Sequence, residues 1–90
     1  MKVYAISYDL KSPDRDYTPL YDAIKNNYQW WHYLESTWLV ATSETAQQIY
    51  GRLVKTITQA DRLIIIKVTK EYYGWLPADA WKWIESNLTE

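Results

Sequence analysis

The sequence predicts a single α+β domain built on a four-stranded antiparallel sheet. Four segments are rich in the aromatic and β-branched residues that favour strands: residues 3–10, 28–34, 37–41 and 61–69. Segments with helical apolar spacing separate the first strand from the second and the third from the fourth. Only Glu35 and Ser36 lie between the two middle strands, which favours an antiparallel hairpin.

The first strand, residues 3–10, carries the aspartate Asp9 at its carboxyl end. An ionised carboxylate in that position needs water, a hydrogen-bond donor or a cation, because burying the bare charge costs several kcal/mol. Asp9 is therefore a candidate catalytic and metal-binding residue. The alternative is that Asp9 caps the following loop by accepting backbone amide hydrogens, a common use of Asp.

A short first helix is predicted after the polar, proline-broken loop at residues 11–16. Thr18 suits the N-cap, and Pro19 suits the first helical position, where its missing amide hydrogen costs nothing. Apolar residues then recur at helical spacing until Asn27 ends the pattern.

The hairpin presents two different faces to its surroundings. Alternation puts one set of side chains on one side (Trp30, His32 and Leu34) and a second set on the other (Trp31, Tyr33 and Glu35). Which set enters the core decides the surface chemistry, and the sequence leaves this open.

A second helix follows, with Thr42 or Ser43 as its expected cap. Its apolar residues form one continuous stripe: Ala46, Ile49, Tyr50, Leu53, Val54 and Ile57. Residues 61–69 hold a nearly continuous β-branched run, which predicts a strand covered on both faces at its start. Pro77 then opens a last helix that extends to Leu88.

This order of elements, βαββαβ with right-handed crossovers, predicts the ferredoxin-like arrangement. Its sheet carries two helices on one face, its first and third strands lie in the middle, and a C-terminal helix is added. We expect one domain over residues 1–90, with a core at 1–70 and a Trp-rich C-terminal extension at 71–90.

Charge and composition exclude several classes of protein. The chain has ten Lys and Arg and eleven Asp and Glu, so it lacks the strongly basic surface typical of proteins that bind nucleic acid mainly through phosphate contacts. The absence of cysteine excludes disulfides and thiolate metal sites, so a reducing cytoplasm is the expected location. No apolar run is long enough to span a membrane. A chain this short buries little surface alone, so we expect a dimer.

Aromatic residues are the main departure from average composition, with six Trp and nine Tyr. Such side chains suit interfaces and base-stacking platforms. Candidate ligand or interface residues are Trp30, Trp31, Tyr33, Tyr73 and Trp75, to be covered by the C-terminal helix, by a second subunit, or by a stacked base. His32 is the only histidine and is expected to be a packed ring rather than a catalytic base.

Three short segments resemble a known family. Residues 6–10 read Ile-Ser-Tyr-Asp-Leu, residues 34–38 read Leu-Glu-Ser-Thr-Trp, and residues 60–65 read Ala-Asp-Arg-Leu-Ile-Ile. In order and spacing they resemble the small CRISPR-associated adaptation protein, the second of the numbered core proteins, and its relative virulence-associated protein D. The resemblance covers roughly residues 1–70 and excludes the Trp-rich ending.

The resemblance implies a homodimeric, defence-related nuclease with a ferredoxin-like fold. In that family the equivalents of Asp9 approach each other across the dimer interface and share a divalent metal, Mg or Mn, for phosphodiester cleavage. Ser36 matches the family serine at the hairpin and could assist through its hydroxyl. The alternative is a non-catalytic dimer that binds a protein partner or a nucleotide through its aromatic surface.

Overall fold

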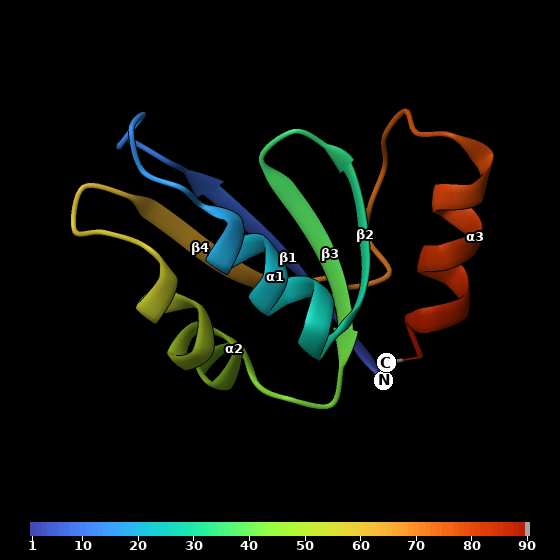
Figure 1. Cartoon of the computed structure of the whole chain (residues 1–90). Coiled ribbons are helices and arrows are strands. Elements are labelled where there is room, and N and C mark those ends of the chain that lie inside the picture. The colour runs from blue at the N-terminus through green and yellow to red at the C-terminus, as the bar shows by residue number, and fades with distance from the viewer. Residues whose placement is uncertain (90) are drawn as a thin grey trace.

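The computed structural model describes residues 1–89, so residue 90, the last of the predicted extension, lies outside the described part of the chain. Its elements follow in the order β1 (Lys2–Asp9), α1 (Thr18–Asn27), β2 (Gln29–Leu34), β3 (Thr37–Thr42), α2 (Ala46–Leu53), the 3-10 turn η1 (Val54–Thr56), β4 (Arg62–Lys67) and α3 (Ala78–Asn87). Figure 1 shows the chain coloured along this order. None of the helices described in residues 1–89 combines the length and apolar character needed to cross a bilayer.

The four strands form one antiparallel sheet in the order β2-β3-β1-β4. The predicted α+β class and four-stranded antiparallel sheet are therefore confirmed, and the strand order is consistent with a ferredoxin-like type. β1 and β3 occupy the middle, as expected. The register places Asp9 opposite Arg62 on β4 and Ser7 opposite Thr37 on β3.

The sheet has two unequal faces. α1 and α2 cover one face, where the main core lies; its fully buried members are Ile6, Leu20, Ile24, Val40, Ile49 and Leu53, with Trp38 almost fully buried. α3 packs on the opposite face over a smaller cluster of Val3, Ala41, Ile84 and Leu88. The β1 residue in this cluster is Val3, at the start of the strand, and the cluster includes no residue from the carboxyl half of β1.

The start of α1 differs from the prediction by one residue. Tyr17 is the N-cap, so Thr18 is the first helical residue and Pro19 the second. The expected cap by the Thr18 side chain is wrong; instead the Thr18 amide donates to Asp16 Oδ1 at 2.9 Å. Proline remains suited to this turn, because none of the first amides of a helix has an intrahelical acceptor.

The cap of α2 is Thr45, so the expected cap at Thr42 or Ser43 is also wrong. Thr45 and Gln48 form a reciprocal capping box, with Gln48 N donating to Thr45 Oγ1 at 3.2 Å and Thr45 N donating to Gln48 Oε1 at 2.8 Å. Ile49 and Leu53 are fully buried, as their stripe predicts. The helix ends at Leu53 and tightens into η1, which turns Val54 toward solvent.

The prediction for β4 is wrong in one respect. Leu63 and Ile65 pack against the main core, but Ile64 and Ile66 on the other face are each 55% exposed. β4 lies at the edge of the sheet, beyond the area that α3 covers, so its start is not covered on both faces. A run of β-branched residues predicts a strand, but it does not indicate whether another element covers each face of that strand.

Candidate functional site

Asp9 ends β1 with an open carboxylate. Its side chain is 62% exposed, and Oδ2 lies 2.8 Å from Lys11 Nζ. Within residues 1–89 this ion pair is the one polar contact that the carboxylate makes, and no backbone amide of the following loop donates to it. The alternative use of Asp9, as a cap for that loop, is not what the structure shows.

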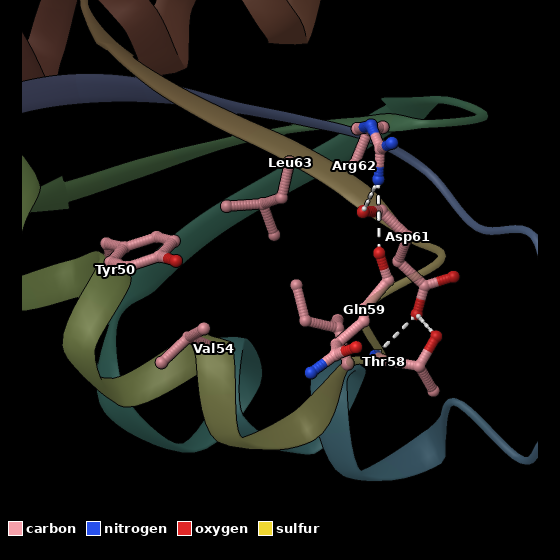
Figure 2. A pocket seen from close by; sticks show the side chains of 8 residues that line it. Tyr50, Val54, Thr58, Gln59, Asp61, Arg62 and Leu63 are labelled. Atoms are coloured by element: carbon pink, nitrogen blue, oxygen red, sulfur yellow. Dashed lines mark hydrogen bonds between the residues drawn. The ribbon is translucent and has the colours of Figure 1, made fainter.

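Asp61 performs the capping role instead. Its Oδ1 accepts from the Lys11 amide at 2.8 Å and from the Tyr17 hydroxyl at 2.6 Å. Its Oδ2 accepts from the Thr58 amide at 2.8 Å and from the Thr58 hydroxyl at 3.1 Å (Figure 2). The residue is only 6% exposed. The two donors from Lys11 and Tyr17 therefore tie the loop after β1 to the loop before β4, and the two from Thr58 hold the second loop in shape.

The charge of Asp61 is strongly stabilised in the folded chain. Burial alone would raise the pKa of this carboxyl, but the hydrogen bonds from Tyr17, Lys11 and Thr58 outweigh burial and hold the pKa well below its usual range. In the sequence, Asp61 stood out only as part of the resembling segment 60–65, with no predicted role of its own. The Thr58-x-x-Asp61 spacing, typical of side chains that hydrogen-bond nearby backbone, was the available signal.

Asp9 and Ser36 lie on the same hollow, which we call the strand-end hollow. It has a volume of about 260 Å³ and is lined by Tyr8, Asp9, Leu10, Tyr21, Glu35 and Ser36. The carboxyl end of β1, the helix α1 and the turn between β2 and β3 enclose it. The Ser36 carbonyl accepts from the Tyr8 amide at 3.1 Å, which fixes the turn beside Asp9 and leaves Ser36 exposed.

Glu35 is a residue of this hollow that sequence reasoning did not select. It was read as part of the hairpin connection, and the turn brings its carboxylate to the same hollow as Asp9. The only signal in the sequence was its position next to Ser36. Within residues 1–89, no group of three or more His, Cys, Asp or Glu side chains lies close enough together to hold a metal ion.

Aromatic rings form one wall of the strand-end hollow. The Tyr8 ring lies 6.3 Å from that of Tyr21, which stacks 6.1 Å from Trp38. The Tyr8 hydroxyl accepts from Trp38 Nε1 at 2.9 Å, so its own O–H is free to donate. Burial is the main cause that raises the pKa of Tyr8, so this phenol stays protonated at neutral pH.

His32 packs as the sequence predicts. Its ring stacks on Trp38 with centroids 3.7 Å apart, and Nε2 lies 3.2 Å from the Glu35 carbonyl oxygen. Both the ring face and one ring nitrogen are thus engaged by structural neighbours. The geometry gives His32 a role in holding the hairpin turn that carries Glu35 and Ser36.

The five aromatic candidates do not form one surface. Trp30 lies on the α1 side of the sheet, where Lys25 Nζ is 5.5 Å from its ring. Trp31 is buried on the α3 side, and Tyr33 donates from its hydroxyl to Asp79 Oδ2 of α3 at 2.6 Å. Tyr73 and Trp75 are fully exposed on the segment between β4 and α3.

An apolar hollow of about 300 Å³ lies beside Tyr73 and Trp75. Its wall is lined by Leu34, Leu39, Val68, Tyr72, Leu76 and Trp81, among others. The hollow is separate from the strand-end hollow, because no residue lines both. Asp9 and Ser36 therefore lie in a different region of the molecule from Tyr73 and Trp75.

Comparison of the chain with protein-family models, with curated protein sequences and with solved structures finds no match.

Proposed function

We propose that the chain is a ferredoxin-like homodimer that cleaves phosphodiester bonds with Mg²⁺ or Mn²⁺ held between the Asp9 residues of its two copies. The observation that carries the proposal is the open Asp9 carboxylate at the end of a central strand, next to Ser36 and free of backbone donors. The sequence resemblance at residues 6–10, 34–38 and 60–65 supports the same reading.

The chemistry of the donors fits a hard divalent cation. Mg²⁺ and Mn²⁺ prefer oxygen ligands, which Asp9, Glu35 and Ser36 supply at the strand-end hollow. One copy offers only two carboxylates there, so the proposed site needs the second copy to complete it. When bound, the ion would generate the attacking hydroxide and neutralise charge on the phosphate.

The chain's own side chains have separate tasks in this proposal. Asp9 would hold the cation, and Lys11, now 2.8 Å from Asp9, would then be free to pair with a phosphate oxygen. Ser36 donates its hydroxyl to the phosphate, and the Tyr21 ring offers an apolar face to a base. His32 has no part in proton transfer.

The test is a cleavage assay on purified protein. Labelled RNA, DNA, and linear and cyclic dinucleotides are incubated with Mg²⁺ or Mn²⁺, with and without chelator. Cleavage should require the metal and vanish in Asp9→Asn, which keeps size but removes the charge that holds the cation. Asp22→Asn on α1 is the matched control, because it removes an exposed aspartate far from Asp9 in the chain, and His32→Ala should retain activity.

Three outcomes contradict the proposal. The enzyme reading fails if the wild type cleaves none of these substrates, or if Asp9→Asn cleaves as well as wild type. The shared site fails independently if light scattering shows a monomer at micromolar concentration with no dependence on concentration.

A second candidate function is a non-catalytic dimer that binds a nucleotide or protein through its aromatic surface. The full exposure of Tyr73 and Trp75 beside an apolar hollow favours it. In this case nucleotides should quench tryptophan fluorescence in the wild type, and Trp75→Ala should remove most of the change. No cleavage and no quenching would exclude both the nuclease and nucleotide binding by the aromatic surface.

A further inference from the structure

β4 is an outer strand with a free edge. Among the strands of residues 1–89 it pairs with β1 alone, and Val68 N donates to Val3 O at 2.8 Å at the end of this ladder. The N–H and C=O groups of successive residues in a strand point to opposite edges. Those of Ile64 and Ile66 therefore point toward β1, as those of Val68 do. The N–H and C=O groups of Leu63, Ile65 and Lys67 consequently point away from the sheet. Edges of this kind are templates for an added strand.

A hollow adjoins this edge on the α2 side of the sheet. It has a volume of about 370 Å³, and its apolar wall comes from Tyr50, Val54, Ile57 and Leu63. Figure 2 shows the Leu63 side chain on β4 directed toward Val54, with the Tyr50 ring farther along α2. Tyr50 and Val54 are partly exposed although both are large apolar residues. A strand added to β4 would place alternate side chains over this hollow.

The opposite face of the edge is also apolar. Ile64 and Ile66, each 55% exposed, project from the same face of the sheet as α3, in the part of that face beyond the α3 cluster. An added strand would therefore meet apolar surface on both of its faces. Its backbone would complete the hydrogen bonds of β4, and its alternate side chains would cover Ile64 and Ile66 on one face and the hollow on the other.

Charge decides which strand fits. β4 carries Arg62 at one end and Lys67 at the other, with four apolar residues between them. Antiparallel pairing of β4 with the β4 of a second copy matches residues that both point outward, so in the register centred on Ile65 it would set Lys67 opposite Leu63 and Arg62 opposite Val68, and neither cation would meet an acidic residue. A strand with an acidic residue at each end would instead pair with both.

We propose that the β4 edge binds an extended segment of a partner protein, antiparallel to β4, with acidic residues opposite Arg62 and Lys67 and apolar residues between them. This interaction is independent of the function proposed for Asp9. Main-chain hydrogen bonds supply affinity, while the hollow at Tyr50 and Val54 and the two terminal charges supply selectivity.

The test uses a fluorescein-labelled peptide, Glu-Val-Leu-Val-Leu-Glu, in a fluorescence anisotropy titration with the full chain. We expect saturable binding that weakens as salt is added. A peptide with Lys in place of both Glu residues should bind at least about ten-fold more weakly, because its ends repel Arg62 and Lys67. Lys67→Glu should reduce binding of the acidic peptide by a similar factor.

Two controls separate edge pairing from unspecific attraction. Lys82→Glu makes the same charge change on an exposed residue of α3 and should leave binding unchanged within about two-fold. N-methylation of the third and fifth peptide amides, which would face β4, should abolish binding. Methylation of the second and fourth amides should not, since these face away from the edge.

The proposal is overturned if no saturable binding occurs, or if the position of N-methylation makes no difference. It is also overturned if Lys67→Glu converts a dimer to a monomer in light scattering, because a second copy then occupies the edge. Asp9→Asn should retain full peptide binding. Loss of cleavage with retained binding, or the reverse, therefore distinguishes the two proposals.

Discussion

Asp9 and Asp61 are two aspartates at the ends of neighbouring strands, yet the fold treats them in opposite ways. Asp9 is the last residue of β1, 62% exposed in its side chain, with one ion pair to Lys11. Asp61 precedes β4, is 6% exposed, and accepts four hydrogen bonds. The comparison shows that the number of donors around a carboxylate, more than its place on a strand, separates a structural acid from one available for chemistry.

The physical reason is the cost of burying charge. A carboxylate that loses water must regain equivalent hydrogen bonds from the protein, and one that regains them has no capacity left for a ligand. Asp61 has its oxygens filled by Lys11, Tyr17 and Thr58. Asp9 keeps its oxygens in solvent, where a cation or a phosphate-bound water can reach them.

Substitutions in the main core give the largest loss of stability against which the effects at Asp9 and Asp61 can be compared. Ile49→Ala and Leu53→Ala should each lower the free energy of unfolding by about 2 to 5 kcal/mol, because both side chains are fully buried against the sheet and truncation leaves a cavity. Urea denaturation measures the loss. A change below about 0.5 kcal/mol would mean that α2 does not hold the main core together.

Asp61→Asn should cause the next largest loss. The amide keeps the shape of the side chain but replaces one acceptor oxygen with a donor, which then faces the donors of Thr58 or of Lys11 and Tyr17. We expect the midpoint of thermal unfolding to fall by at least about 5 °C for a domain of this size. Calorimetry provides the measurement. Asp22→Asn, on the exposed face of α1, should change the midpoint by no more than about 2 °C.

Lowering the pH should reveal the stabilising role of Asp61 without any substitution in the core. The pKa of Asp61 in the folded chain lies well below its ordinary value of 3.8, so as pH falls below about 5 the unfolded chain takes up a proton that the folded chain does not. Stability is therefore full above this range and declines as pH falls through 4 and below. Glu44, whose pKa is lowered by Arg52 and Tyr28, adds to the same decline.

Thermal unfolding between pH 2.5 and 7 checks this expectation. The wild type should lose stability more steeply below pH 5 than Asp61→Asn, since the variant has no carboxyl to protonate at this position. Equal slopes in the two proteins would show that Asp61 does not contribute to acid unfolding. Equal slopes would also mean that Asp61 and Asp9 do not differ in their contribution to stability.

Local patterns in the sequence predicted the helices and strands. Most features that they did not predict depend on contacts between residues far apart in the chain. The two-residue connection at Glu35 and Ser36 and the buried pair Ile49 and Leu53 depend on neighbours in the chain, and each was predicted. The cap of α2 is an exception, because a local signal was present: the Thr45-x-x-Gln48 spacing of a capping box distinguishes Thr45 from Thr42 and Ser43.

The candidate site shows the same division. Asp9 was predicted from its place at the end of a strand and Ser36 from the family resemblance, and the fold brings both to one hollow. The role of Asp61 depends on Lys11 and Tyr17, which lie 50 and 44 residues away in the chain. No local pattern reports donors at that separation. The exposure of β4 likewise depends on where α3 ends its coverage, not on the residues of β4.

Asp9→Asn should give the smallest change in stability and so provides the sharpest test of the comparison. An exposed ion pair such as that of Asp9 with Lys11 contributes little, so the free energy of unfolding should change by no more than about 0.5 kcal/mol in urea. Any metal-dependent cleavage should nevertheless vanish, because the lost charge is the one that would hold the cation. Lys11→Ala, which removes the other half of the pair, should leave stability within the same limit. If instead Asp9→Asn destabilises the chain as much as Asp61→Asn, then Asp9 is a structural residue, and the open carboxylate is not a reason to expect catalysis.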